Sequence, residues 1–130
     1  MKRIYLSGPI MGCTDAEAKD WRAVAKGLCP TAIDPMARDY RGIEGDHAEE
    51  IVRNDKADIR NCDGVLVYWH LLNRPNVGTS MEILYAWEQG KPIAVVNATG
   101  EPLSPWITYH CSGRVFRTIK EALRALLLLT

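Results

Sequence analysis

The sequence predicts an α/β fold in which a parallel β-sheet carries helices on both faces. Short apolar runs alternate along the chain with longer amphipathic stretches, and this alternation is typical of strand–helix–strand units joined by right-handed crossovers. The chain has 130 residues, too few for a second domain. We therefore expect a single domain over residues 1–130.

The first third of the chain predicts a strand, a helix and a second strand. Ile4–Leu6 is the first strand, and Ser7-Gly8-Pro9 ends it. Thr14 and Glu17 have the spacing of a capping box, in which each side chain satisfies a free backbone N–H of the first helical turn. The helix that follows has apolar residues at helical spacing: Trp21, Val24, Ala25 and Leu28. Thr31–Ile33 is a second short strand.

The middle of the chain begins with a loop. Asp34–Gly45 contains a proline and two glycines and predicts irregular structure. Asp46 and Glu49 resemble a second capping box, which opens a helix to about Asn61. Val65–Tyr68 is almost continuously apolar, as expected for a third strand that is covered on both faces.

A loop over Leu71–Val77 leads into the next helix, Gly78–Gln89. Gly90 is placed to end that helix in the left-handed conformation. Pro92–Val96 predicts a fourth strand, and Asn97–Gly113 predicts irregular structure.

The last segment predicts a short strand and a helix. Val115 and Phe116 form the fifth strand, and Thr118 and Glu121 form a third capping box. The final helix has five residues facing inward: Ile119, Ala122, Leu123, Leu126 and Leu127.

This succession predicts a flavodoxin-like, Rossmann-like doubly wound parallel sheet of four to five strands in the order 2-1-3-4-5. Ligands of such sheets bind outside the carboxyl ends of the strands, where the strand order reverses. The segments that follow Leu6 and Tyr68 should therefore face one crevice.

Composition excludes several classes of protein. Sixteen basic and sixteen acidic residues give a formal net charge of 0, so binding of a nucleic-acid polymer by bulk charge is not expected. The four cysteines contain no CxxC pair, which argues against a zinc site. The start, Met1–Leu6, lacks an apolar leader, and the longest apolar run, Ala125–Leu129, is far below the ~20 residues that span a bilayer. We expect a cytoplasmic protein with reduced cysteines that uses no metal or cofactor and binds no membrane.

Two segments at the predicted crevice carry candidate chemistry. Ser7-Gly8-Pro9 places a hydroxyl beside a glycine, which lets a ligand approach the backbone; the alternative is an ordinary turn. Glu82 falls in or near the first turn of its predicted helix, where the helix dipole favours a charged carboxylate. An ionised carboxylate is the nucleophile that glycosyl transfer needs, because the transition state is a sugar cation. The alternative is a glutamate that only complements the dipole.

Asp55 and Asp58 form a third candidate, because residues three apart lie on one helical face. One of them could protonate a leaving base if burial or a neighbouring carboxylate raised its pKa. The alternative is a solvated helix face. A helix that starts at Asp46 places Asp55 about 13 Å along its axis, so a late start or an inward tilt is required.

Together these segments resemble the nucleoside 2-deoxyribosyltransferase family over about residues 4 to 106. The matching segments are Ile4-Tyr5-Leu6-Ser7-Gly8-Pro9, Asn54-Asp55, Asp58-Ile59, Cys62 to Val67, Gly78 to Ala86, Gly90 to Ile93 and Ser104-Pro105-Trp106. The resemblance implies the doubly wound fold and a nucleoside or nucleotide substrate.

The resemblance also implies roles for individual residues. Glu82 attacks the anomeric carbon of a 2′-deoxyribosyl group, Tyr5 positions Glu82, and Asp55 handles the base. A second base or water then takes the sugar. Ser104 matches a residue that a neighbouring subunit contributes, so at least a homodimer is implied. The expected substrate-binding residues are Ser7, Gly8, Pro9, Asn76, Gly78, Ser80 and Ser104.

Two departures from the family pattern leave the substrate open. Transferases carry aspartate six residues before the nucleophile, where this chain has Asn76, and they tend to have asparagine at Ser104. Related 2′-deoxynucleoside 5′-monophosphate N-hydrolases carry uncharged residues and serine there. A carboxylate would repel a 5′-phosphate. These hydrolases also have an arginine soon after Gly8, for which Arg38 and Arg41 are the candidate replacements. Transferase, monophosphate hydrolase and a non-catalytic nucleotide-sensing module all remain open.

Overall fold

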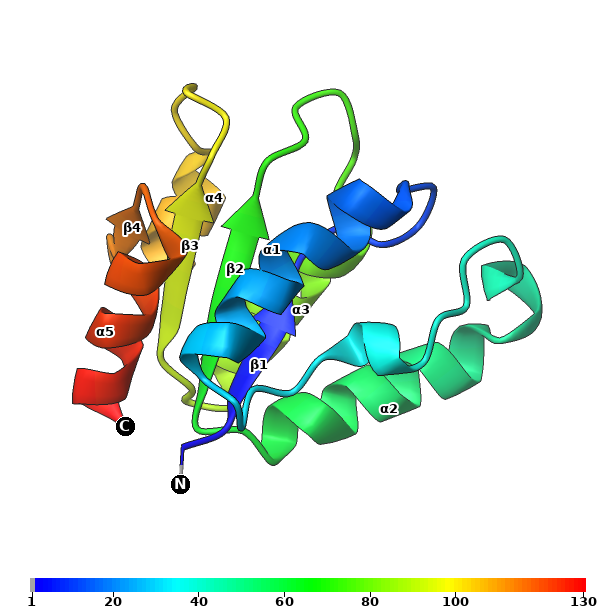
Figure 1. Cartoon of the computed structure of the whole chain (residues 1–130), viewed down its shortest axis with the longest axis horizontal. Coiled ribbons are helices and arrows are strands. Elements are labelled where there is room, and N and C mark those ends of the chain that lie inside the picture. The colour runs from blue at the N-terminus through cyan, green and yellow to red at the C-terminus, as the bar shows by residue number, and fades with distance from the viewer. Residues whose placement is uncertain (1) are drawn as a thin grey trace.

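The computed structural model describes residues 2–130 and has the predicted α/β architecture (Figure 1). The sheet has four strands, in the order β1 (Ile4–Ser7), β2 (Gly64–Trp69), β3 (Ile93–Asn97) and β4 (Val115–Phe116). Each neighbouring pair is parallel. The carboxyl ends of all four strands therefore lie at the same edge of the sheet.

Helices cover both faces of this sheet, as Figure 1 shows. One face is covered by α1 (Asp15–Leu28) and α5 (Ile119–Leu129). The other face is covered by α2 (Ala48–Arg60), α3 (Val77–Glu88) and α4 (Pro105–His110). In the part of the chain described, no helix combines the length and apolar character needed to cross a bilayer.

Each face of the sheet has its own core, because successive strand residues point to opposite sides. Leu6 and Leu66 pack with α1 and α5, whereas Tyr5 and Val67 pack with α2, α3 and α4. All four side chains are fully buried. Burial of one such apolar side chain contributes about 1.5–3 kcal/mol. The alternation also sends Tyr5 and Ser7 to the α3 side of β1, where the candidate site lies.

One of the three predicted capping boxes is confirmed in full, at Thr14, and at Thr118 only the half formed by the threonine side chain is present. Thr14 Oγ1 accepts a hydrogen bond from the Glu17 N–H at 3.2 Å, and the Glu17 carboxylate accepts one from the Thr14 N–H at 2.9 Å. Thr118 Oγ1 likewise accepts from the Glu121 N–H at 3.2 Å. These bonds fix the starts of α1 and α5.

The capping box predicted at Asp46 is wrong. Asp46 ends a short 3₁₀ helix, η2 (Glu44–Asp46), and α2 begins at Ala48 after His47, whose side chain makes no capping bond. The 3₁₀ turn occupies the chain where the capping residue would need extended backbone. The helix therefore starts two residues later than predicted.

The second predicted strand, Thr31–Ile33, is reduced to a single bridge between Ile33 and Tyr5. The Ile33 N–H donates to the Ile4 carbonyl at 2.8 Å, and the Leu6 N–H donates to the Ile33 carbonyl at 3.0 Å. Beyond Ile33 the chain turns into a second 3₁₀ helix, η1 (Pro35–Ala37). The predicted order 2-1-3-4-5 is therefore corrected to four strands, with Ile33 beside the outer edge of β1.

Residues 97–113 were predicted to be irregular, but they contain α4. Ser104 caps this helix by accepting from the Trp106 N–H at 3.2 Å, and Pro105 occupies the first turn, where its missing N–H costs nothing. A helix of six residues is too short to show a clear apolar period. A further correction concerns Leu127, which is 42% exposed because Leu126 takes the inward position.

Candidate active site

The centre of the site is the carboxylate of Glu82, which α3 presents to the end of β1. The Tyr5 hydroxyl donates a hydrogen bond to Oε2 at 2.5 Å, and the Ser7 hydroxyl donates one to Oε1 at 2.8 Å. Tyr5 and Ser7 are both fully buried, so water does not compete for these hydrogen bonds. Each of the two carboxylate oxygens is therefore held by one hydroxyl group from β1.

The surroundings of Glu82 raise its pKa toward neutral pH. Burial raises the pKa of Glu82 to about 7, with a further contribution from the negative charge of Asp55. The hydrogen bonds from Tyr5 and Ser7 act in the opposite direction, because they stabilise the carboxylate. The sequence predicts Glu82 in or near the first helical turn; α3 begins at Val77, so Glu82 lies in the second turn, where the helix dipole contributes little.

Asp55 reaches the same site from α2. This helix packs along α3, where the Lys56 ammonium lies 5.0 Å from the ring centroid of Tyr85. The late start and this packing bring Asp55 close enough for its charge to raise the pKa of Glu82. Burial raises the pKa of Asp55 itself. Two carboxyl groups with raised pKa values thus share one side of the sheet, an arrangement typical of functional sites.

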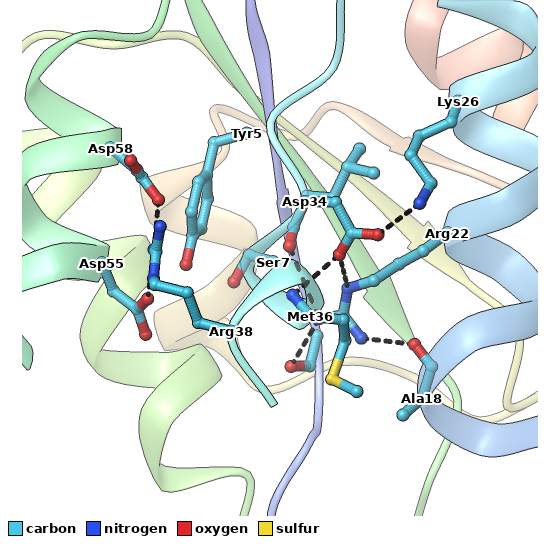
Figure 2. A network of polar contacts seen from close by, with 12 residues as sticks. Tyr5, Ser7, Ala18, Arg22, Lys26, Asp34, Met36, Arg38, Asp55 and Asp58 are labelled. Carbon is cyan, nitrogen blue, oxygen red and sulfur yellow. Dashed lines mark hydrogen bonds and ion pairs between the residues drawn. The ribbon is translucent and has the colours of Figure 1, made fainter. Parts of the chain in front are cut away.

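Arg38 sets the charge balance beside Asp55 (Figure 2). Its Nη2 atom lies 2.6 Å from Asp58 Oδ2 and 3.5 Å from Asp55 Oδ1. This cation opposes the effect of burial on the pKa of Asp55, while the charge of Asp58 adds to it. Asp58 is therefore part of an ion pair and not a solvated helix face.

The glycine after β1 has a packing role. A Cβ atom at Gly8 would lie 2.6 Å from Trp21 Cζ2 and 3.4 Å from the Tyr68 carbonyl oxygen. Only glycine lets this turn pass between α1 and β2. Pro9 continues the turn away from the sheet and is partly exposed. The turn thus lies against the end of β2, from which the segment after Tyr68 departs.

The candidate substrate-binding residues Asn76, Gly78 and Ser80 lie two to six residues before Glu82, at the start of α3. Asn76 precedes the helix in the left-handed conformation, with φ of 52°, and its Nδ2 donates to the carbonyls of Leu71 and Arg74, both at 3.1 Å. Its amide therefore holds the loop. Gly78 is exposed, and Ser80 is partly buried in the first turn.

Ser104 lies away from this group. It is exposed at the start of α4, and its hydroxyl accepts the capping bond from Trp106. Among residues 2–130, Ser104 makes no hydrogen bond with Tyr5, Ser7 or Glu82, so it does not complete the site of its own chain.

Arg74 is a residue that the sequence prediction missed. Its Nη1 donates to the Met11 carbonyl at 3.4 Å, and its Nη2 lies 3.7 Å from Glu17. Arg74 thus lies against the loop between β1 and α1. Of the two arginines proposed for this place, Arg38 pairs with Asp58 and does not reach the loop. Arg41 does lie against it: its Nη1 donates to the Cys13 carbonyl at 3.1 Å, and its guanidinium pairs with Asp15 and Asp39. The predicted meeting of the two crevice loops was the signal that could have identified Arg74.

Two hollows in the surface are lined by residues other than Glu82, Asp55 and Asp58. One of about 340 Å³ lies between α1 and the end of β2, and another of about 640 Å³ lies over α4. Glu82 lines neither of them. In residues 2–130, no three His, Cys, Asp or Glu side chains are arranged to hold a metal ion.

Comparisons with known proteins now place this geometry in a family. A family model described as nucleoside 2-deoxyribosyltransferase matches residues 4–123. The chain belongs to the nucleoside 2-deoxyribosyltransferase family. This membership confirms the resemblance found in the sequence, and the match extends it beyond Trp106 to α5. A comparison with curated proteins gave no match.

Two solved structures share the fold of this member of the nucleoside 2-deoxyribosyltransferase family. A 2-deoxyribosyltransferase from Bacillus psychrosaccharolyticus has 20% identity and a TM-score of 0.72, over 92% of this chain and 88% of that one. The CMP N-glycosidase BcmB from Clostridium botulinum has 18% identity and a TM-score of 0.58, over 96% of this chain and 98% of that one. At these identities the likeness is one of fold.

Proposed function

We propose that this protein cleaves the N-glycosidic bond of 2′-deoxyribonucleosides, or of their 5′-monophosphates, through a covalent deoxyribosyl intermediate on Glu82. The observation that carries the proposal is the carboxylate of Glu82, held by the hydroxyls of Tyr5 and Ser7 at 2.5 and 2.8 Å. Family membership supports the same chemistry. A nucleophile needs this fixed geometry, because an ordered carboxylate loses little entropy when it attacks.

In the first half of the reaction, an oxygen of the Glu82 carboxylate forms a bond to C1′ as the bond from C1′ to the base nitrogen breaks. The electron pair of the broken bond goes to the base, which takes up a proton. Asp55 is the proposed donor, because burial raises its pKa and keeps a proton available closer to neutral pH. Arg38 then faces the carboxylate that this transfer leaves on Asp55.

In the second half, a nucleophile attacks C1′ and the bond to the Glu82 oxygen breaks, which restores the carboxylate. If the nucleophile is a nitrogen of a second base, the reaction is a transfer. If it is water, the reaction is hydrolysis. In both cases the Asp55 carboxylate left by the first half takes up the proton that the nucleophile loses. The hydroxyls of Tyr5 and Ser7 donate to the carboxylate that leaves, so they stabilise the same charge in both halves of the reaction.

A 5′-monophosphate substrate is favoured by the residues around the first loop. Asn76 is neutral, so no carboxylate at that position repels a phosphate. Arg74 reaches the same loop and offers a guanidinium, which binds phosphate oxygens well. Replacement of Arg74 by glutamine should lower kcat/KM for a deoxynucleoside 5′-monophosphate more than for the matching deoxynucleoside. Equal losses for the two substrates would contradict a phosphate site at Arg74.

The proposed assembly is a homodimer that forms through α3 and α4. These helices expose large apolar side chains, among them Met81 at 67% and Trp106 at 74%. Apolar patches of this kind mark interaction surfaces. Ser104 lies beside Trp106 on this surface, where a partner subunit could receive it, as the family resemblance implies. Replacement of Met81 by glutamate should yield monomers in sedimentation experiments, whereas a native monomer would contradict the proposed dimer.

The deciding experiment incubates the protein with deoxynucleosides and deoxynucleoside 5′-monophosphates, with and without a second free base, and separates the products by chromatography. Exchanged nucleosides indicate transfer, and free sugar or sugar phosphate indicates hydrolysis. Glu82→Gln should abolish base release, while Glu88→Gln, at an exposed position of the same helix, should retain it. Ligand binding with no base release by the native protein would support a nucleotide-sensing module instead.

A further inference from the structure

Arg22 is a buried cation on the opposite side of β1 from Glu82. It belongs to α1, and its side chain is only 1% exposed. Val24, on the same helix, is 53% exposed, so the chain places a charged residue inside and leaves an apolar one outside. Burial of a guanidinium carries a large desolvation penalty that its partners must compensate. An arrangement this costly requires a specific set of partners.

The guanidinium of Arg22 holds the backbone on both sides of Ser7. Its Nη2 donates to the Gly8 carbonyl at 3.1 Å and to the Leu6 carbonyl at 3.4 Å. Its Nη1 donates to the Ala18 carbonyl at 2.6 Å, which anchors the group to α1 (Figure 2). Ser7 is the residue between the two gripped carbonyls, and its hydroxyl donates to Glu82.

The positive charge of Arg22 is only partly balanced. Asp34 Oδ1 lies 3.6 Å from Arg22 Nε, but Asp34 Oδ2 lies 2.6 Å from Lys26 Nζ. One carboxylate is therefore shared between two cations, and Figure 2 shows this chain of contacts. Among residues 2–130, the Arg22 Nε atom has no hydrogen-bond partner. The surplus positive charge lies next to the end of β1.

We propose that Arg22 is a positioning residue for Glu82: it fixes Ser7 through the two flanking carbonyls and supplies a buried positive charge that favours the attacking carboxylate. This inference rests on the proposed function for its catalytic meaning. The charged and titratable groups that face Glu82 are Tyr5 from β1, Asp55 from α2, with Arg38 and Asp58 beside it, and Arg22 from α1.

The direction of each electrostatic effect agrees with this role. Burial and the charge of Asp55 raise the pKa of Glu82, whereas Arg22 lowers it. Burial lowers the pKa of Arg22, and the charges of Asp34 and Glu82 act against that effect. Arg22 is thus a cation on the far side of the strand that counteracts Asp55.

The test measures the titration of Glu82 by the carbon-13 resonance of its carboxyl group, assigned by its loss in Glu82→Gln. Arg22→Gln removes the cation, so the midpoint should move up by about 0.5–1 pH unit. Asp34→Asn leaves an amide oxygen to accept the hydrogen bond from the Met36 N–H, but removes the negative charge that offsets Arg22. The midpoint should then move down by a similar amount. Arg22→Lys, which keeps a charge, should move the midpoint back toward the native value.

The two variants of opposite sign keep the inference open to refutation even if one of them fails to fold. Arg124→Gln, which removes an exposed charge on α5, is the matched control and should leave the midpoint unchanged. An unchanged midpoint in Arg22→Gln, or in Asp34→Asn, would reduce Arg22 to a packing role. The titration needs no turnover, so a protein that releases no base would overturn the proposed function and leave this inference to be decided separately.

Discussion

Replacement of Tyr5 by phenylalanine isolates the contribution of one hydroxyl to the charge of Glu82. The ring stays in its buried place, and only the 2.5 Å hydrogen bond to Oε2 is lost. A hydrogen bond to a charged group contributes about 1.5–3 kcal/mol, which corresponds to about 1–2 pH units. The pKa of Glu82, about 7 in the native protein, should therefore rise to about 8–9.

The expected loss of activity follows from this shift. At pH 7 the ionised fraction of Glu82 falls from about one half to about 1–10%, so base release should slow by about 5–50-fold. At alkaline pH the remaining hydrogen bond from Ser7 still orients the carboxylate, and most of the loss should disappear. Burial raises the pKa of Tyr5 well above its usual value, so the native hydroxyl stays a donor over the whole range.

The assay is the pH dependence of kcat/KM for base release, followed by chromatography. Tyr85→Phe is the matched control: the Tyr85 hydroxyl accepts a hydrogen bond from Arg60 at 3.0 Å and, among residues 2–130, is not one of the hydroxyls that donate to Glu82. The profile of this control should match that of the native protein. A loss in Tyr5→Phe that is equal at every pH would refute the reasoning, because it would mean that the hydroxyl does not act through the charge of Glu82.

Three further predictions test other parts of the structure. Glu82→Gln should be more stable than the native protein at pH 7 and above, by about 3 kcal/mol at most, because the unfolded native chain loses the Glu82 proton near pH 4.5 while the folded protein keeps it up to about pH 7. Denaturant unfolding of both proteins at acidic and alkaline pH measures the difference, and an equal gain in stability at the two pH values would contradict the prediction. Gly8→Ala should destabilise the protein by about 1–3 kcal/mol through the clash with Trp21, and a thermal melt that matches the native one would show that the turn adjusts. Arg38→Gln should raise the pKa of Asp55 and move the alkaline limb of kcat/KM to higher pH, unless Asp55 takes no part in proton transfer.

Local patterns in the sequence predicted most of the fold. The apolar run Val65–Tyr68 lies within β2, and the threonine caps at Thr14 and Thr118 fix the starts of two helices. These features depend on residues that are near one another in the chain. The prediction of a strand over Thr31–Ile33 was wrong because η1 turns the chain away from β1 directly after Ile33. The helix α4 was missed because six residues are too few to show a helical period.

The site was predicted in part for a related reason. Topology alone indicates that residues after β1 and β2 meet, and the family resemblance selects Tyr5, Asp55 and Glu82. Neither indicates the environment of each group. Arg22 has the sequence spacing of an ordinary charged helix residue, and only the packed structure shows that it is buried behind Ser7. Raised pKa values depend on such long-range burial, so they cannot be read from the sequence.

The two hydroxyls that hold Glu82 come from alternate residues of one four-residue strand, and this has a consequence for inherited variation. Insertion or deletion of a residue between Tyr5 and Ser7 would turn one hydroxyl to the opposite side of the sheet, because side chains alternate along a strand. A point substitution can remove one of the two hydroxyl donors and keep the other in place. An insertion or deletion of one residue between them always separates the two donors onto opposite faces of the sheet. Members of this lineage should therefore differ in the lengths of their loops while the spacing within β1 stays constant.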